Sequence, residues 1–288
     1  MNEVQDHYNN LLAKHYTWMF GTSFAAKVAE QKTILEDALS AVAAGVKLGL
    51  AVDLGSGPGF QTIALCDMGY SPVLSLDTSE LLLKELQSHQ GNLPIQTICA
   101  DLSKFNEFVP SATADVIVCM GDTITHLDSK DVVENLLRLV FDALTPGGKF
   151  VLSYRDLSAD ATGLDRFIPV YADESKIMTC FLEFDQAETV LVHDLVYNRN
   201  GQQWVLEKSS YRKLRLPIDW VEDAMTQAGF VVRRGQAGRL LRLVGQKAVA
   251  PVCPGFRGGK GGWTLPDYPE LNKAGPIDLD SQADHRSS

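Results

Sequence analysis

Short apolar runs separated by helical patterns dominate the first 156 residues of the chain. Five runs with strand character cover residues 49–53, 72–76, 95–102, 114–120 and 149–156. Helical patterns cover residues 24–46, 59–68 and 129–144, and Thr78-Ser79 caps a further helix. A return to a parallel strand needs a crossover connection, which is usually a helix. The alternation therefore predicts an α/β fold with a doubly wound, mostly parallel sheet.

Residues 157–216 interrupt this alternation. Runs rich in β-formers lie at 176–185, 189–198 and 203–216, and Asn198-Arg199-Asn200-Gly201 is a strong hairpin signal. We therefore predict an inserted antiparallel β meander. Alternation along its middle strand places His193 on one face with Leu191, Leu195 and Tyr197. That face is predicted to be packed or to face a ligand, with a structural role for His193 as the alternative.

The two ends of the chain differ from its centre. Tyr8, Leu11, Leu12, His15 and Met19 fall at roughly helical spacing, which predicts an amphipathic helix. After a helix from Pro217 and strands at 230–234 and 240–246, residues 247–288 become rich in proline and glycine. This tail is predicted to be disordered or draped on the surface.

Composition narrows the classes of function. The net charge of −10 argues against nucleic acid as the main partner, because phosphate binding needs a basic face. No stretch has the length of a membrane span, and the N-terminus lacks an apolar signal core. We expect a cytoplasmic protein, with a homo-oligomer left open. No metal-ligand spacing occurs, and four of the five cysteines (Cys66, Cys99, Cys119 and Cys180) are predicted to be reduced core residues.

A glycine-rich loop follows the first strand. The strand run ends at Asp53, and Gly55-Ser56-Gly57-Pro58-Gly59 leads directly into a helix. Such a turn lets backbone approach a ligand, with the N–H groups of the helix pointing at it. A dinucleotide fingerprint requires a glycine at position 60, where this chain has Phe60. Taken alone, the loop is either a cofactor site or a tight turn.

Acidic residues follow the next two strands. Asp77 stands about twenty positions after the glycine loop, at the end of the second strand. A carboxylate there can accept hydrogen bonds from both hydroxyls of a ribose. The third strand ends in the same way, at Asp101. Helix capping is the alternative for both residues.

These features form an ordered set with Leu144-Thr145-Pro146-Gly147-Gly148 before the fifth strand. Over residues 5–246 the set resembles the class I, Rossmann-like S-adenosylmethionine-dependent methyltransferases of the small-molecule type. The resemblance implies a seven-stranded sheet that ends with one antiparallel strand. It also implies S-adenosylmethionine as cofactor, with Asp101 and Leu102 at the adenine. The cofactor-side residues are then Tyr16, Trp18, Asp53, Gly55, Ser56, Gly57, Gly59, Asp77, Thr78, Asp101, Leu102, Met120 and Gly121.

The N-terminal aromatic residues resemble a lid of the same family. Aromatic faces attract a sulfonium as they attract other cations. Tyr8, Tyr16, Trp18 and Met19 are the candidates. The predicted organisation is a helical lid at 1–46, a methyltransferase domain at 47–246 that contains the insertion 157–216, and the tail.

The loop after the fourth strand lines the reaction centre in this family. Asp122, Thr123 and His126 are therefore the substrate-side candidates, with Asp122 and His126 predicted to be catalytic. Tyr154-Arg155-Asp156 resembles the His-Arg-Asn sequence of glycine/sarcosine N-methyltransferases, which implies a substrate carboxylate on Arg155. Pairing of Arg155 with Asp156 or Asp165 is the alternative. The predicted substrate contacts are Tyr8, His126, Arg155 and Tyr211.

The predicted function is in-line transfer of a methyl group to a small molecule, with a carboxylate-bearing acceptor as one candidate. Two alternatives stay open. A related enzyme could transfer an aminopropyl group, although the chain shows the single Asp122 where an acidic pair is expected. A non-catalytic protein could retain the fold and bind the nucleotide.

Overall fold

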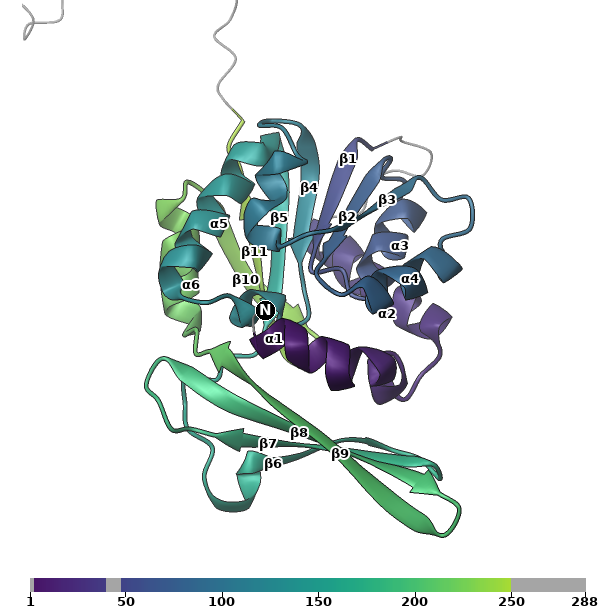
Figure 1. Ribbon diagram of the computed structural model, residues 1–288. Helices are drawn as coiled ribbons and strands as arrows, with labels where there is room; N and C mark the ends of the chain where they lie inside the picture. Colours follow the sequence, from purple (N-terminus) through teal and green to yellow (C-terminus); the bar gives the residue numbers. More distant parts are fainter. Residues whose placement is uncertain (1–2, 40–47, 250–288) are drawn as a thin grey trace, which may run out of the picture. The chain divides into compact units, whose positions relative to one another are not determined.

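The computed structural model of the protein describes residues 3–39 and 48–249 (Figure 1). The helix expected at 24–46 is described as α2 (Phe24–Leu39). Its last predicted turns and the predicted tail from residue 250 onwards lie outside the described residues, as does Cys253.

A seven-stranded sheet forms the centre of the fold. Its order is β10-β11-β5-β4-β1-β2-β3. The five strands from β3 to β5 in this order run parallel to one another, whereas β11 runs antiparallel to both β5 and β10. The strands are β1 (Leu50–Leu54), β2 (Val73–Asp77), β3 (Ile95–Cys99), β4 (Ala114–Cys119), β5 (Leu144–Tyr154), β10 (Val231–Ala237) and β11 (Leu240–Gln246). The predicted doubly wound α/β sheet with one antiparallel strand is confirmed.

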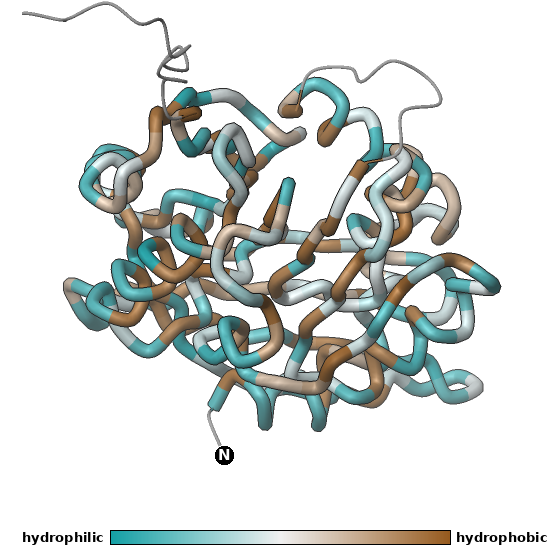
Figure 2. The backbone as a smooth tube through the Cα atoms, turned by 90° about the horizontal axis from the view of Figure 1, so that it is seen from above, coloured by the Kyte–Doolittle hydropathy of each residue, from teal (hydrophilic) through white to brown (hydrophobic). Residues whose placement is uncertain are grey.

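Helices cover both faces of this sheet. Along β4, Ile117 and Cys119 pack in one apolar cluster and Val116 and Val118 in another, because successive side chains of a strand point to opposite faces. Helices α5 (Lys130–Ala143) and α6 (Ile218–Gln227) cover the first face. Helices α2, α3 (Phe60–Asp67) and α4 (Glu80–His89) contribute to the cluster on the second. Figure 2 shows apolar positions concentrated along the central strands.

The insertion after β5 forms a separate antiparallel sheet in the order β6-β7-β8-β9. Its strands are β6 (Phe167–Ala172), β7 (Lys176–Glu183), β8 (Thr189–Asn200) and β9 (Gln203–Leu214). The sequence pattern indicated the last three, but β6 contains Pro169 and mostly exposed residues, so its pattern is weak.

The burial of β8 corrects the prediction for its faces. Its buried face carries Val190, Val192, Asp194 and Val196, whereas the face of His193 is only half-buried. His193 lies within hydrogen-bonding distance of Glu183 (3.0 Å) and Ser210 (2.7 Å). The face of β8 that carries His193, which was predicted to be packed or to face a ligand, is therefore the more exposed of its two faces.

The N-terminal segment lies between the two sheets (Figure 1). It consists of α1 (Glu3–His7), a turn of π-helix, η1 (Tyr8–Leu12), and two 3₁₀ turns, η2 (Ala13–His15) and η3 (Trp18–Phe20). Leu11 and Leu12 pack with Met178 and Val196 of the four-stranded sheet. An ion pair between Lys14 and Glu207 attaches the segment to β9.

The cysteines differ in part from the prediction. Cys119 is buried and Cys66 and Cys180 are half-buried, but Cys99 is exposed, because it lies on the edge strand β3. Among the described residues, no group of three or more His, Cys, Asp or Glu could hold a metal ion. No helix in the described part of the chain is long and apolar enough to cross a membrane.

The turn between β1 and α3 generates a test of packing. Gly59 has a φ of +92°, and a Cβ added there would lie 2.2 Å from Cδ1 of the fully buried Leu86. We expect Gly59→Ala to lower the free energy of unfolding by about 1–3 kcal/mol more than Gly201→Ala, because overpacking adds to the cost of the left-handed backbone. Gly201 is a matched control, since its φ is +62° and nothing lies within 4 Å. Urea denaturation measures both, and equal losses would contradict the packing argument.

Candidate functional site

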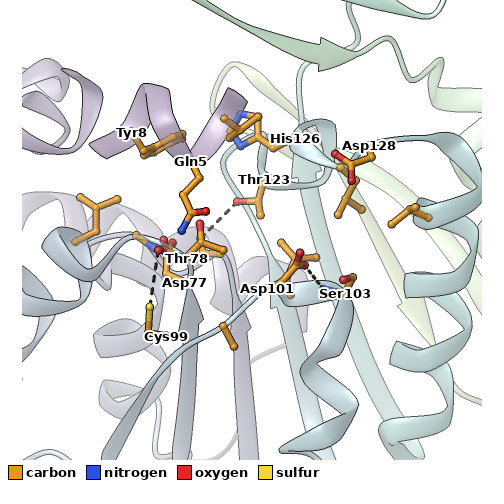
Figure 3. Close-up of a pocket in the computed structure, with 18 of the residues that line it drawn as sticks. Gln5, Tyr8, Asp77, Thr78, Cys99, Asp101, Ser103, Thr123, His126 and Asp128 are labelled. Atoms are coloured by element: carbon orange, nitrogen blue, oxygen red, sulfur yellow. Dashed lines mark hydrogen bonds between the residues drawn. The ribbon is translucent and has the colours of Figure 1, made fainter. Parts of the chain in front are cut away.

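A cavity of about 340 Å³ lies at the carboxyl ends of the parallel strands, beneath α1 (Figure 3). Ligands of open α/β sheets bind at this edge. The lining residues come from α1, the glycine loop, the ends of β2 and β3, and the loop after β4. They are Val4, Gln5, Tyr8, Tyr16, Gly55, Gly57, Asp77, Thr78, Leu82, Cys99, Ala100, Asp101, Leu102, Ser103, Thr123, His126, Leu127, Asp128 and Val132.

The glycine loop is shaped by contacts that exclude side chains. Gly55 has a φ of +70°, and a Cβ there would lie 2.2 Å from Cγ2 of Thr123. The N–H groups of Gly55 and Ser56 donate to the carbonyl of Leu76, at 2.8 and 2.9 Å. At Gly57 the nearest atom to an added Cβ would be Cε1 of Tyr16, at 3.6 Å. The loop therefore packs tightly against Thr123 at Gly55 and leaves space for another group at Gly57.

Asp77 connects the glycine loop to the next helix. Its carboxylate accepts hydrogen bonds from the N–H groups of Gly57 (2.7 Å) and Ser79 (2.8 Å). Burial nevertheless raises its pKa. A carboxylate has about four acceptor positions, so it can accept further bonds from a ligand. In Figure 3 the side chain of Gln5 extends from α1 toward Asp77 and Thr78.

One further group makes this end of the cavity fit a nucleoside. Asp101 is exposed, and one carboxylate oxygen accepts from the N–H of Ser103 at 2.8 Å. The second oxygen can accept from a ligand amino group. Carboxylates at two neighbouring strand ends match the ribose and adenine positions expected of S-adenosylmethionine.

Several predicted cofactor residues lie elsewhere. Asp53 is buried behind the loop, where it accepts a hydrogen bond of 2.6 Å from Thr62, and burial raises its pKa to about 7. Trp18 donates a hydrogen bond of 2.6 Å to Asp173, in the turn between β6 and β7. Residues of the prediction that do not line this cavity are Trp18, Asp53, Ser56, Gly59, Met120 and Gly121. For these residues, cofactor contact stays a prediction.

Asp122 is the buried centre of an ion-pair cluster in which Lys213 is also buried and Arg155 is exposed. One carboxylate oxygen accepts from the backbone N–H of Arg155 (2.6 Å). The other accepts from Nη1 of Arg155 (2.6 Å) and from Nζ of Lys213 (3.1 Å). Burial would raise its pKa, but the charges of Lys213 and Arg155 outweigh burial and lower it to about 2. Such a carboxylate is a weak base, so the geometry supports an anchoring role instead of the predicted proton transfer.

The same cluster bears on the prediction for Arg155. Arg155 forms its ion pair with Asp122 and not with Asp156 or Asp165, which were the expected partners. Asp156 instead accepts from the N–H of Ile218 at 3.0 Å. Arg155 lines neither this cavity nor the second one described below. Contact of Arg155 with a substrate stays a prediction.

His126 lies among aromatic rings at the other end of the cavity. Its ring centroid is 5.8 Å from that of Tyr8 and 5.6 Å from that of Tyr211. Burial, followed by the charge of Lys213, lowers its pKa to about 3, so the imidazole is neutral at physiological pH. Its Nε2 atom is buried and has no partner among the described residues.

A histidine–carboxylate pair that the sequence analysis missed supports this aromatic group. Nε2 of His7 lies 3.0 Å from Oδ2 of Asp194, and both side chains are buried. The ring of His7 stacks on Tyr211 with centroids 4.2 Å apart. One signal was available, since Asp194 interrupts the buried row of valines in β8. Its partner, 187 positions away, left no signal.

A second cavity, of about 410 Å³, adjoins the first. The two share Val4, His126, Leu127 and Asp128. The other residues that line the second cavity are Glu3, Thr189, Arg212, Lys213 and Leu214. It therefore lies between α1, the loop after β4 and the four-stranded sheet.

The cluster at Asp122 generates a test of stability. We expect Asp122→Asn to lower the free energy of unfolding by about 3 kcal/mol at pH 7, because it leaves Lys213 buried without its anion. The folded pKa of about 2 lies below the unfolded value of about 3.9, so the stabilisation is present above pH 4 and lost as the pH falls through about 2. Denaturation at several pH values should show the deficit shrinking between about pH 4 and 2. Asp219→Asn is the control, because Asp219 forms an exposed ion pair. Equally small losses of stability in Asp122→Asn and Asp219→Asn would show that the cluster at Asp122 does not stabilise the fold.

Comparisons with known proteins agree with this geometry. Residues 51–148 match the family model of a methyltransferase domain. A glycine/sarcosine N-methyltransferase from Halorhodospira halochloris is 26% identical over 107 residues, which are 36% of this chain and 39% of that protein. A structure of an S-adenosylmethionine-dependent methyltransferase from Clostridium acetobutylicum has a TM-score of 0.63 and 15% identity, covering 84% of this chain and 99% of its own.

A third similar protein has its cofactor bound. It is an amino pentose methyltransferase from Micromonospora echinaspora, with a TM-score of 0.63 and 13% identity, covering 82% of this chain and 96% of its own. At such identities the solved structures establish the fold alone, and the matched family model covers residues 51–148, which contain the glycine loop, Asp77 and Asp101. Residues 51–148 therefore form a methyltransferase domain, in a fold that the chain shares with S-adenosylmethionine-dependent methyltransferases.

Proposed function

We propose that the protein transfers a methyl group from S-adenosylmethionine to a small-molecule acceptor, with a carboxylate-bearing acceptor as the favoured candidate. One observation carries the proposal. Two adjoining cavities share the wall formed by His126, Leu127 and Asp128, and only the first is lined by the glycine loop and by Asp77. Donor and acceptor thus have separate spaces that meet at one point.

The first cavity supplies the groups that the donor needs. Asp77 would accept hydrogen bonds from the ribose hydroxyls, and Asp101 from the adenine amino group. Gly57 leaves room for a ligand beside Tyr16. When bound, S-adenosylmethionine supplies a methyl group made electrophilic by its positively charged sulfur. The chain itself has to hold both reactants in line and exclude water.

The N-terminal segment performs the exclusion of water. Gln5, Tyr8 and Tyr16 cover the cavity from the side of α1. Burial raises the pKa of Tyr16 to a value far above neutrality, so its phenol stays uncharged, and that of Tyr8 is raised as well. Neutral aromatic rings can contact a sulfonium favourably. This arrangement supports the lid expected for residues 1–46.

His126 is suited to orient the acceptor. A neutral imidazole adds no positive charge that would repel the sulfonium. With the proton on Nδ1, its unpartnered Nε2 can accept a hydrogen bond from the acceptor's N–H or O–H group. With a pKa of about 3, the imidazole is a weak base and does not hold a proton at neutral pH. We therefore assign to His126 hydrogen bonding to the acceptor and not proton removal.

The comparisons support a small acceptor. The relative from Halorhodospira halochloris is named for glycine and sarcosine, and the structure from Micromonospora echinaspora for an amino pentose. Aminopropyl transfer is less favoured. It would need a free carboxylate in the loop after β4, and the candidate, Asp122, is paired with Arg155 and Lys213. A non-catalytic role is separated from methyl transfer by the experiments below.

Binding of the donor is the first test. We expect isothermal titration with S-adenosylmethionine to show one site, and Asp77→Asn to weaken it about 10- to 100-fold by removing charge-assisted hydrogen bonds to the ribose. Glu80→Gln is the control, since Glu80 is an exposed neighbour at the start of α4. Absence of binding by the unmodified protein would overturn the proposed function. Equal affinity of Asp77→Asn and the unmodified protein would overturn the role of Asp77.

The pH dependence of turnover tests the role of His126. Because its imidazole stays neutral above about pH 4, we expect His126→Asn to lower the rate at every pH and to leave the shape of the profile unchanged between about pH 5.5 and 8.5. The assay follows transfer of the labelled methyl group to an acceptor found by screening metabolites. An inflection near pH 6.5 that disappears in His126→Asn would instead identify His126 as the general base.

A further inference from the structure

The second cavity contains a cation whose hydrogen-bonding capacity is only partly used. Lys213 lies in its wall, and the lysine side chain is 9% exposed. An ammonium has three donors. Among the described residues, the one hydrogen-bond acceptor of Nζ is Asp122, at 3.1 Å. Nζ also lies over the ring of Tyr211, 5.8 Å from its centroid, so at most two donors remain for a ligand.

The surrounding charges leave Lys213 as the group for an anion to contact. Asp122 is shared with Arg155, so two cations divide one carboxylate. Arg212, the other cation in the wall, forms a bidentate pair with Asp185, at 2.8 and 2.7 Å. Glu3 and Asp128, the acidic residues of the lining, are both exposed. The deeper part of the wall thus offers positive charge, and its rim negative charge.

A second feature of the cavity points to a ligand. Nε2 of His126 is buried and unpartnered among the described residues, and His126 stands in the wall that both cavities share. A buried polar atom without a partner is unfavourable unless a ligand or water satisfies it. A molecule that reaches from Lys213 to His126 would satisfy both residues. Its far end would then open onto the first cavity.

From this geometry we propose that the second cavity is the acceptor site and that Lys213 binds the acceptor's carboxylate. The inference rests on the proposed methyl transfer and deepens it. It replaces Arg155, which the sequence resemblance suggested, with a lysine from the inserted sheet. Lys213 is a specificity-determining residue here, because it contacts the acceptor away from the reacting atom. The single charge of the ammonium matches the single charge of a carboxylate, and competition with phosphate tests this choice.

The test uses acetate as a probe, because it carries the carboxylate alone. Protein saturated with S-adenosylhomocysteine is titrated with ¹³C-labelled acetate, and broadening of the carboxyl signal measures binding. We expect saturable binding that weakens about tenfold or more in Lys213→Met, since a charge-assisted hydrogen bond is lost. Lys213→Arg should retain it. Lys208→Met is the matched control, because Lys208 is exposed on the opposite face of the same strand.

The possible outcomes separate the two proposals. Equal acetate binding by Lys213→Met and the unmodified protein would overturn the role of Lys213, and so would absence of saturable acetate binding. Stronger competition by inorganic phosphate than by unlabelled acetate would overturn the assignment to a carboxylate. Failure of S-adenosylhomocysteine itself to bind would contradict the proposed function. Thermal unfolding of Lys213→Met and Lys213→Arg, together with their affinity for S-adenosylhomocysteine, shows whether an altered fold is the cause of a loss.

Discussion

A single buried carboxylate joins the three parts of the chain that make the site. Asp122 follows β4 with a φ of +77°, and it binds Arg155 at the end of β5 and Lys213 on β9. A buried charge is unfavourable unless it is paired, so the loop, the fifth strand and the inserted sheet are held in one arrangement. His126 lies four residues further along the same loop and takes its place from this arrangement.

The two sheets contribute different parts of the site. The parallel sheet supplies the glycine loop, Asp77 and Asp101, all of which depend on the ends of adjacent strands. The antiparallel sheet supplies Lys213 and Tyr211 and attaches the N-terminal segment through His7 and Asp194. Variation in the inserted sheet could thus change the acceptor without disturbing the donor cavity.

The sequence was informative where the signal is local. Tight turns and strand ends are marked by residues that are neighbours in the sequence. The sheet and the placement of Asp77 and Asp101 at its edge could therefore be predicted. The pairs His7–Asp194 and Asp122–Lys213 join residues 187 and 91 positions apart, and a pattern along the chain carries no trace of such contacts.

The N-terminal aromatic residues show a subtler limit. The segment was identified, but the sequence could not show which rings face the cavity. Successive α, π and 3₁₀ turns between residues 3 and 20 break the 3.6-residue period on which such an inference depends. Tyr8 and Tyr16 line the cavity, whereas Trp18 turns to Asp173.

A crystal structure with S-adenosylhomocysteine and acetate bound tests the central claim most directly, because it shows both cavities at once. We expect the nucleoside in the first cavity, with its ribose on Asp77, its adenine near Asp101 and its sulfur toward His126. Acetate should contact Lys213 in the second cavity. A nucleoside bound away from Asp77, or acetate bound away from Lys213 and against Arg155, would contradict the division between donor and acceptor cavities.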